Sequence, residues 1–172
     1  MNVFKVLVTG DFSSGKTQFI KTLTGNVLLT EKKVTDKKEM LQKDTTTVAL
    51  DYGKLEIGKN IIHLFGTPGQ KRFDFMLNVL DRNISAFIVL VDSTNIVNIK
   101  NARRFIEFFN KGNLPFVVAC NKQDLKDAYT LDQIKSFLDM DVPLMPLVAK
   151  DRESSLKLLQ YVLSKIDQPV LV

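Results

Sequence analysis

The stretch Gly10-Asp11-Phe12-Ser13-Ser14-Gly15-Lys16-Thr17 decides the fold of this chain, because it matches the pattern G-x4-G-K-[ST]. It stands between an apolar run at 3–8 and a helical pattern at 17–24. In that context the glycines let backbone N–H groups approach phosphate oxygens, and the following helix points its positive end at the anion. Lys16 is expected to reach the terminal phosphates, and the Thr17 hydroxyl to bind Mg²⁺. The predicted phosphate-binding residues are Asp11, Phe12, Ser13, Ser14, Gly15, Lys16 and Thr17.

Short apolar runs and helical patterns alternate along the rest of the chain. Strands are expected at 48–57, 61–65, 86–91, 116–120 and 142–147, and helices at 74–83, 99–110, 131–138 and 154–166. Residues 48–65 predict an antiparallel hairpin, whereas the runs 86–91 and 116–120 are typical of parallel strands covered on both faces. Together they predict an α/β, doubly wound, three-layer P-loop fold with a six-stranded, mostly parallel sheet and one antiparallel edge strand. The polar stretch 26–43 is expected to be a long mobile loop.

Length and composition limit the classes of protein. A chain of 172 residues predicts one domain over 1–172, and 45% hydrophobic with 25% charged residues excludes a disordered chain, a collagen and a coiled coil. A single cysteine indicates a reducing, cytoplasmic location. The net charge of +5 is interpreted as a solvated surface, with no nucleic-acid partner. Neither a glycine at position 2 nor a C-terminal cysteine is present, so we expect no direct membrane anchor. Cys120, His63 and Asp92 are interpreted as structural residues.

The stretch Asn121-Lys122-Gln123-Asp124 follows the predicted strand 116–120 and indicates which base is bound. The Asp124 carboxylate can accept hydrogen bonds from the N1–H and the 2-amino group of guanine. Adenine offers no such pair of donors and would leave the carboxylate unpaired. The predicted ligand is therefore a guanine nucleotide, GTP or GDP.

With these two motifs the chain resembles the small Ras-like GTPases over nearly its whole length. The resemblance implies that Asn121 ties the base loop to the phosphate loop, that Lys122 covers the guanine face and that Asp124 reads the guanine edge. Val148-Ala149-Lys150 stands where the family has S-A-K, whose backbone N–H binds guanine O6. Ala149 and Lys150 are therefore expected beside the base.

The resemblance also implies two segments that respond to the γ-phosphate. In the first, Thr47 is expected to bind Mg²⁺ together with Thr17, and Thr46 is the alternative. In the second, Gly69 matches the glycine that senses the γ-phosphate and Gln70 the glutamine that orients the attacking water. The expected catalytic residues are Lys16, Gly69 and Gln70. Gly66 stands where the family carries an acid that holds Mg²⁺ through a water, which predicts weak or unusual magnesium dependence and slow intrinsic hydrolysis.

The stretch 64–70, LFGTPGQ, is similar to a prokaryotic subgroup of small GTPases that are often paired with roadblock-type proteins. The resemblance implies a guanine-nucleotide switch that hydrolyses GTP slowly and uses GTP or GDP and Mg²⁺. It implies a regulatory partner, either an activator or a roadblock-type protein, and an effector. A catalytic arginine would come from Arg72 or from a partner. Two alternatives stay open: a nucleotide-binding scaffold with negligible hydrolysis, which Gly66 and Phe12 favour, and a small nucleotide or metabolite kinase.

Overall fold

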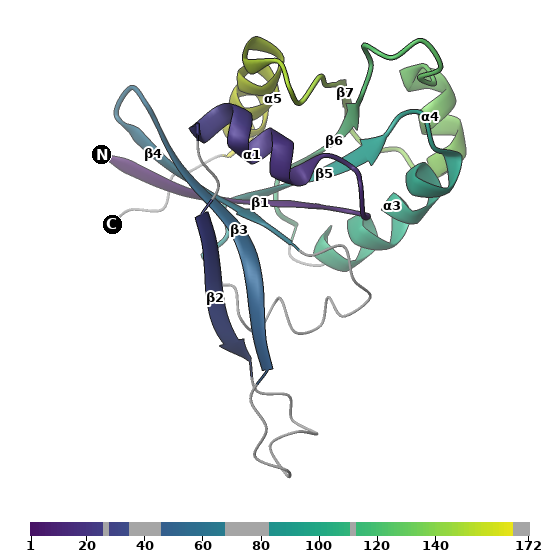
Figure 1. Cartoon of the computed structure of the whole chain (residues 1–172). Coiled ribbons are helices and arrows are strands. Elements are labelled where there is room, and N and C mark those ends of the chain that lie inside the picture. The colour runs from purple at the N-terminus through teal and green to yellow at the C-terminus, as the bar shows by residue number, and fades with distance from the viewer. Residues whose placement is uncertain (26–27, 35–45, 68–82, 111–112, 167–172) are drawn as a thin grey trace.

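The computed structural model describes residues 1–25, 28–34, 46–67, 83–110 and 113–166. A central sheet runs through the molecule, with helices on both faces (Figure 1). In chain order, the elements of the described residues are β1 (Asn2–Gly10), α1 (Lys16–Thr24), β2 (Leu28–Val34), β3 (Thr46–Ile57), β4 (Asn60–Gly66), β5 (Ala86–Asp92), α3 (Ile96–Phe109), β6 (Phe116–Asn121), α4 (Leu131–Leu138), β7 (Leu144–Pro146) and α5 (Arg152–Ser164). The helix expected at 74–83 falls, apart from residue 83, outside the described residues.

The strands of the described residues form one sheet in the order β2-β3-β4-β1-β5-β6-β7. β3 pairs antiparallel with both of its neighbours, and the pairs from β4 to β7 are parallel. The expected doubly wound α/β fold is confirmed, including its six strands and its one antiparallel strand. A seventh strand, β2, is added beside β3 at the edge of that sheet.

The loop expected over residues 26–43 is wrong for residues 28–34, which form β2. These residues pair with β3 from Leu28 opposite Tyr52 to Val34 opposite Thr46. The physical reason is the unpaired edge of the long strand β3, whose N–H and C=O groups offer a template for another strand. The charged residues of the stretch interrupt the apolar pattern from which a strand is predicted. β2 and β3 extend together away from the body of the sheet (Figure 1).

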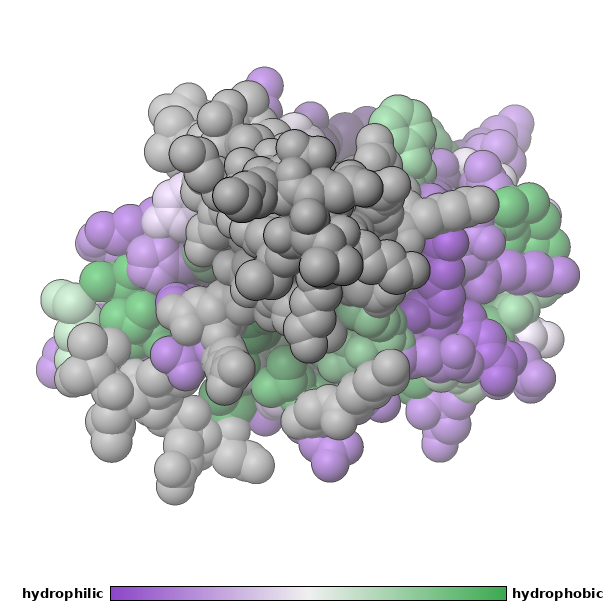
Figure 2. Space-filling view, turned by 90° about the horizontal axis from the view of Figure 1, so that it is seen from below, coloured by the Kyte–Doolittle hydropathy of each residue, from purple (hydrophilic) through white to green (hydrophobic). Residues whose placement is uncertain are grey.

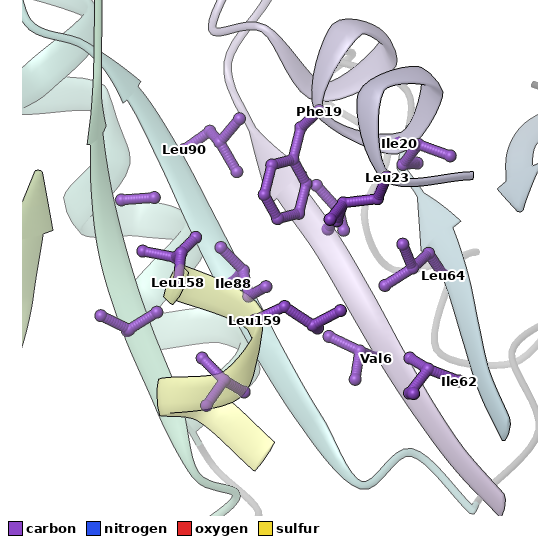
Figure 3. Close-up of a cluster of buried hydrophobic side chains, with 14 of the residues drawn as sticks. Val6, Phe19, Ile20, Leu23, Ile62, Leu64, Ile88, Leu90, Leu158 and Leu159 are labelled. Atoms are coloured by element: carbon purple, nitrogen blue, oxygen red, sulfur yellow. The ribbon is translucent and has the colours of Figure 1, made fainter. Parts of the chain in front are cut away.

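One hydrophobic core lies between the sheet and the pair α1 and α5. Phe19, Ile20 and Leu23 of α1 point toward side chains of β1, β4 and β5, and Leu158 and Leu159 of α5 complete the cluster (Figure 3). All five are at most 1% exposed. Burial of side chains of this size stabilises the fold by about 1.5–3 kcal/mol each. This core therefore fixes α1, and with it the phosphate loop that precedes α1.

A second core lies on the other face, beneath α3 and α4. It contains Phe105 and Phe109 of α3 and Cys120 of β6. Burial raises the pKa of the Cys120 thiol to about 12, so this cysteine is a packing residue, as interpreted from the sequence. His63 lies on β4, where its Nδ1 is 2.7 Å from the hydroxyl oxygen of Tyr52. Its side chain is therefore satisfied by hydrogen bonding.

The parallel strands end together at one edge of the sheet, and the sequence motifs gather there. Gly10 at the end of β1 lies opposite Leu90 of β5, and Asp92 at the end of β5 lies opposite Asn121 of β6. This edge is where doubly wound sheets bind ligands. In the described ranges, no helix has the length and apolarity needed to cross a membrane. Figure 2 shows hydrophilic residues interspersed with small hydrophobic areas around the residues drawn in grey.

Candidate functional site

The phosphate loop between β1 and α1 has a backbone that only certain residues can adopt. Gly10, Ser13 and Gly15 have positive φ angles of 143°, 64° and 103°. A Cβ atom at Gly10 would collide with the carbonyl oxygen of Leu90, and one at Gly15 with the side-chain nitrogen of Asn121. Both glycines are therefore required by close approach as well as by conformation.

The ammonium group of Lys16 lies inside this loop. It donates to the carbonyl oxygens of Gly10 at 2.6 Å and of Asp11 at 3.0 Å, and the side chain is only 9% exposed. Burial lowers its pKa to about 8, although the nearby carboxylates of Asp11 and Asp51 oppose the shift. Close by in the loop, the Ser14 hydroxyl is buried and has no hydrogen-bond partner among the described residues. A desolvated cation and an unpaired hydroxyl both fit the phosphates of a nucleotide.

Thr17, the first position after the lysine, contacts an acid on another element. Its hydroxyl donates to Oδ2 of Asp51 at 2.5 Å. Asp51 belongs to β3 and lies directly opposite Gly66 of β4. A hydroxyl that donates its proton keeps its lone pairs for a metal ion, so this pair fits Mg²⁺. The described part of the chain contains no group of three or more His, Cys, Asp or Glu residues placed for a metal. Phosphates and waters would complete such a site.

Several predicted residues cannot be placed. Thr46 and Thr47 are the first two residues of β3, but their side chains lie outside what the structure describes. Gly69, Gln70 and Arg72 also lie outside the described residues. Their predicted roles in metal binding and hydrolysis stay predictions.

Asn121, at the end of β6, connects the base loop with the phosphate loop. It is 4% exposed, its Nδ2 donates to the carbonyl oxygen of Ser14, and its Oδ1 accepts the backbone N–H of Ala149, both at 2.9 Å. The connection agrees with the role implied by the family resemblance. The backbone N–H of Ala149, a residue expected beside the base, is thus hydrogen-bonded to Asn121.

Lys122 is held beside the base loop by an ion pair. It has a positive φ of 67°, and its Nζ lies 2.7 Å from Oδ2 of Asp92. Burial opposes ionisation of Asp92, but hydrogen bonds from Lys122 and Thr94 nevertheless hold the pKa of this carboxyl below its ordinary value. Asp92 therefore anchors the loop, as interpreted from the sequence, and fixes the stem of Lys122.

Asp124 lines a cleft of about 270 Å³ that reaches to Gly15 at the end of the phosphate loop. The other lining residues are Gln18, Asn121, Lys122, Leu125, Val148, Ala149 and Lys150. Lys150 lies with its Nζ 2.9 Å from Oδ2 of Asp124 and holds the pKa of that carboxyl below its ordinary value. The structure therefore brings the predicted base-binding residues together around one cleft, next to the phosphate loop.

Two asparagines of α3 support the phosphate loop, and the sequence analysis missed both. Asn98 donates to the carbonyl oxygen of Phe12 at 3.2 Å while its Oδ1 accepts the backbone N–H of Asp92 at 2.8 Å. Asn101 donates to Oδ2 of Asp11 at 2.8 Å. No local motif marks these residues, because the contacts join segments more than 80 positions apart. Asp51 was missed as a site residue because its contact with Thr17 joins segments 34 positions apart.

The chain is similar to several known proteins. A family model described as "conserved hypothetical ATP binding protein" matches residues 26–172. The uncharacterized protein MJ1339 of Methanocaldococcus jannaschii is 33% identical over 126 residues, which cover 73% of this chain and 74% of that protein. Human Ras-related protein Rab-7L1 is 28% identical, with 79% of this chain and 68% of the relative covered. The Ypt/Rab-type GTPase YPT7 of Saccharomyces cerevisiae is 25% identical over 87% of this chain and 74% of its own.

A solved structure supports the fold in particular. The Arl6 BBS3 small GTPase from Trypanosoma brucei, with a bound nucleotide analogue GppNp, superposes with a TM-score of 0.71 at 20% identity, over 95% of this chain and 97% of that one. The family model begins after the phosphate loop at 10–17, so that loop is not part of the match. The chain therefore belongs to the family described as conserved hypothetical ATP binding proteins, and it is a homologue of the small Ras-like GTPases.

Proposed function

We propose that this chain binds GTP and GDP with Mg²⁺ and acts as a molecular switch that hydrolyses GTP slowly. The observation that carries the proposal is the cleft that joins Gly15 of the phosphate loop to the carboxylate of Asp124. A phosphate site at one end and a hydrogen-bond acceptor at the other suit a nucleotide whose base carries two donors. The whole chain, 1–172, is proposed to form the single nucleotide-binding domain.

Guanine is favoured over adenine, although the description of the matched family names ATP. A phosphate loop of this kind accepts either nucleotide, so the discrimination depends on the base loop. The Asp124 carboxylate accepts from guanine N1–H and the 2-amino group, whereas adenine would face it with no such donors. Two missing hydrogen bonds of about 1.5 kcal/mol each correspond to a preference on the order of a hundredfold. When the base binds, Lys150 would either keep its ion pair with Asp124 beside the base or lose that ion pair.

The proposed switch is the response of the segments around Thr47 and Gly69 to the γ-phosphate. Gln70 would orient the attacking water, and a catalytic arginine would come either from Arg72 or from a partner. The similarity of residues 64–70 to the prokaryotic subgroup supports a regulatory partner, an activator or a roadblock-type protein, together with an effector. A guanine-nucleotide scaffold with negligible hydrolysis is the second candidate. It is favoured by Phe12, which is 79% exposed on the phosphate loop, where its bulk would hinder an activator.

The base preference is tested by calorimetry with GDP and ADP in the presence of Mg²⁺. GDP is expected to bind at least a hundredfold more tightly, and equal affinities would end the guanine proposal. Lys150→Ala is the matched control: it removes the ion pair with Asp124 but keeps the acceptor, so the preference should persist. Single-turnover measurements with GTP then separate a slow GTPase from a scaffold. We expect turnover of about 10⁻⁴ s⁻¹ or less for the isolated chain.

A further inference from the structure

We propose that Asp51 is the carboxylate that positions Mg²⁺ in this chain, in place of the acid that the family carries where this chain has Gly66. The inference rests on the proposed function and concerns its metal site. Asp51 would act on the metal through other groups: it accepts the hydroxyl proton of Thr17 and would accept hydrogen bonds from waters on the metal. Asp51 is therefore proposed as a positioning residue.

The first observation is the register of the hairpin formed by β3 and β4. Asp51 of β3 lies directly opposite Gly66 of β4. A Cβ atom built on Gly66 would lie 3.6 Å from Oδ2 of Asp51. The carboxylate on β3 thus occupies the space into which an acidic side chain at position 66 would extend.

The second observation is the contact that this carboxylate makes with the phosphate loop. Oδ2 of Asp51 accepts the hydroxyl proton of Thr17 at 2.5 Å. With its proton held by Asp51, the Thr17 oxygen presents lone pairs to a cation. The Asp51 carboxylate also interacts electrostatically with the ammonium of Lys16. The group therefore faces the place where the phosphates and the metal would bind.

The third observation explains why glycine suits position 66 once an acid stands at 51. A Cβ atom at Gly66 would come within 3.1 Å of the Cβ of Asp51 and 3.0 Å of Cδ1 of Ile20. An acid at both positions would crowd and would place two like charges together in a narrow space. One carboxylate, at position 51, therefore serves the site. The metal site has an acid although position 66 is a glycine. Normal magnesium dependence follows, in place of the weak or unusual dependence expected from the sequence.

The test measures metal affinity apart from catalysis. Protein loaded with GDP is titrated with Mn²⁺ and followed by electron paramagnetic resonance, and GDP release is measured across a Mg²⁺ titration. Asp51→Asn is nearly isosteric and is expected to weaken metal affinity by about 10–100-fold. Asp51 touches no residue of the base cleft but faces the phosphate site, so GDP affinity is also measured in the presence of a chelator. That measurement separates lost phosphate contacts from lost metal affinity, and the metal affinity is expected to fall by more than the chelator-resistant GDP affinity. Glu56→Gln is the matched control, since it removes one exposed carboxylate from the same strand, and it should leave metal affinity unchanged.

A swap variant, Asp51→Gly with Gly66→Asp, moves the carboxylate from β3 to β4 and relieves the crowding between the two positions. It is expected to recover most of the metal affinity that Asp51→Asn loses. If Asp51→Asn binds Mn²⁺ and Mg²⁺ within threefold of the parent while GDP still binds, this inference is overturned and the proposed function stands. If the swap keeps the thermal stability of the parent but binds metal as weakly as Asp51→Asn, the proposed position of the carboxylate is wrong. If the parent binds no GDP at all, the proposed function fails, and this inference fails with it.

Discussion

Raising the pH from 7.0 to 8.8 is expected to weaken the binding of GDP, because Lys16 must be charged to bind phosphate. Among the described residues, the buried ammonium donates to the carbonyl oxygens of Gly10 and Asp11. Burial lowers its pKa to about 8. Burial has removed the water that stabilises the charged ammonium. Phosphate oxygens would stabilise that charge instead, so the pKa of Lys16 rises in the complex. Binding of GDP therefore takes up a proton wherever the free protein has lost one.

The magnitude follows from that pKa. With a pKa of about 8, Lys16 is about 90% charged at pH 7.0 and about 14% charged at pH 8.8. If the bound lysine stays charged throughout, the affinity falls by the ratio of these fractions, about sevenfold, or about 1 kcal/mol. The range stops at pH 8.8 because the guanine N1–H itself begins to ionise at higher pH and would weaken the contact with Asp124.

Calorimetry in two buffers of different ionisation enthalpy measures both the affinity and the number of protons taken up. Proton uptake should rise from about 0.1 per GDP at pH 7.0 to about 0.9 at pH 8.8. Lys16→Arg keeps its charge at every pH, so whatever GDP binding it retains should not depend on pH. Lys150→Ala, which alters a lysine at the other end of the cleft, should keep the dependence of the parent. A constant affinity without proton uptake would show that the buried lysine remains charged and would refute the reasoning.

Three further outcomes are expected. Asp124→Asn should shift the preference from guanine toward xanthine nucleotides, whose 2-oxo group accepts from the new amide; competition binding with XDP and GDP measures this, and an unchanged preference would contradict base recognition by Asp124. Asn121→Ala removes the hydrogen bonds to the Ser14 carbonyl and the Ala149 N–H and leaves both buried groups unpaired, so the free energy of unfolding should fall by about 2–4 kcal/mol; a loss below 1 kcal/mol in urea denaturation would show that the bridge is replaced. The folded pKa of Lys16 lies below the unfolded value of 10.5, so the unfolded chain binds more protons between pH 8 and 10.5. Lys16 should therefore make the protein without nucleotide more stable as the pH rises through that window. The pH slopes of the free energy of unfolding, compared between the parent and Lys16→Met, measure this contribution.

The sequence by itself determined the elements that local patterns encode. The phosphate loop was evident because its glycines, lysine and threonine are contiguous and stand between a strand and a helix. The helix over Leu131–Leu138 begins and ends as predicted, since its apolar spacing is regular and Thr130 caps it through a side-chain hydrogen bond. The continuous apolar runs at β5 and β6 indicated buried parallel strands, and the residues that follow them lie at the ligand-binding edge. The roles of the predicted site residues in binding and catalysis stay predictions.

The tertiary structure alone decided which distant residues meet. β2 forms because β3 offers a free edge, and the sequence of residues 28–34 contains no pattern that predicts pairing with β3. Asp51 faces Thr17, and Asn98 supports Phe12, through contacts between segments 34 and 86 positions apart. Strand order and register set such contacts, and a local pattern specifies which face a side chain takes but not which strand lies beside it. The position of the carboxylate that we propose for the metal site is therefore a property of the β3–β4 register rather than of any motif.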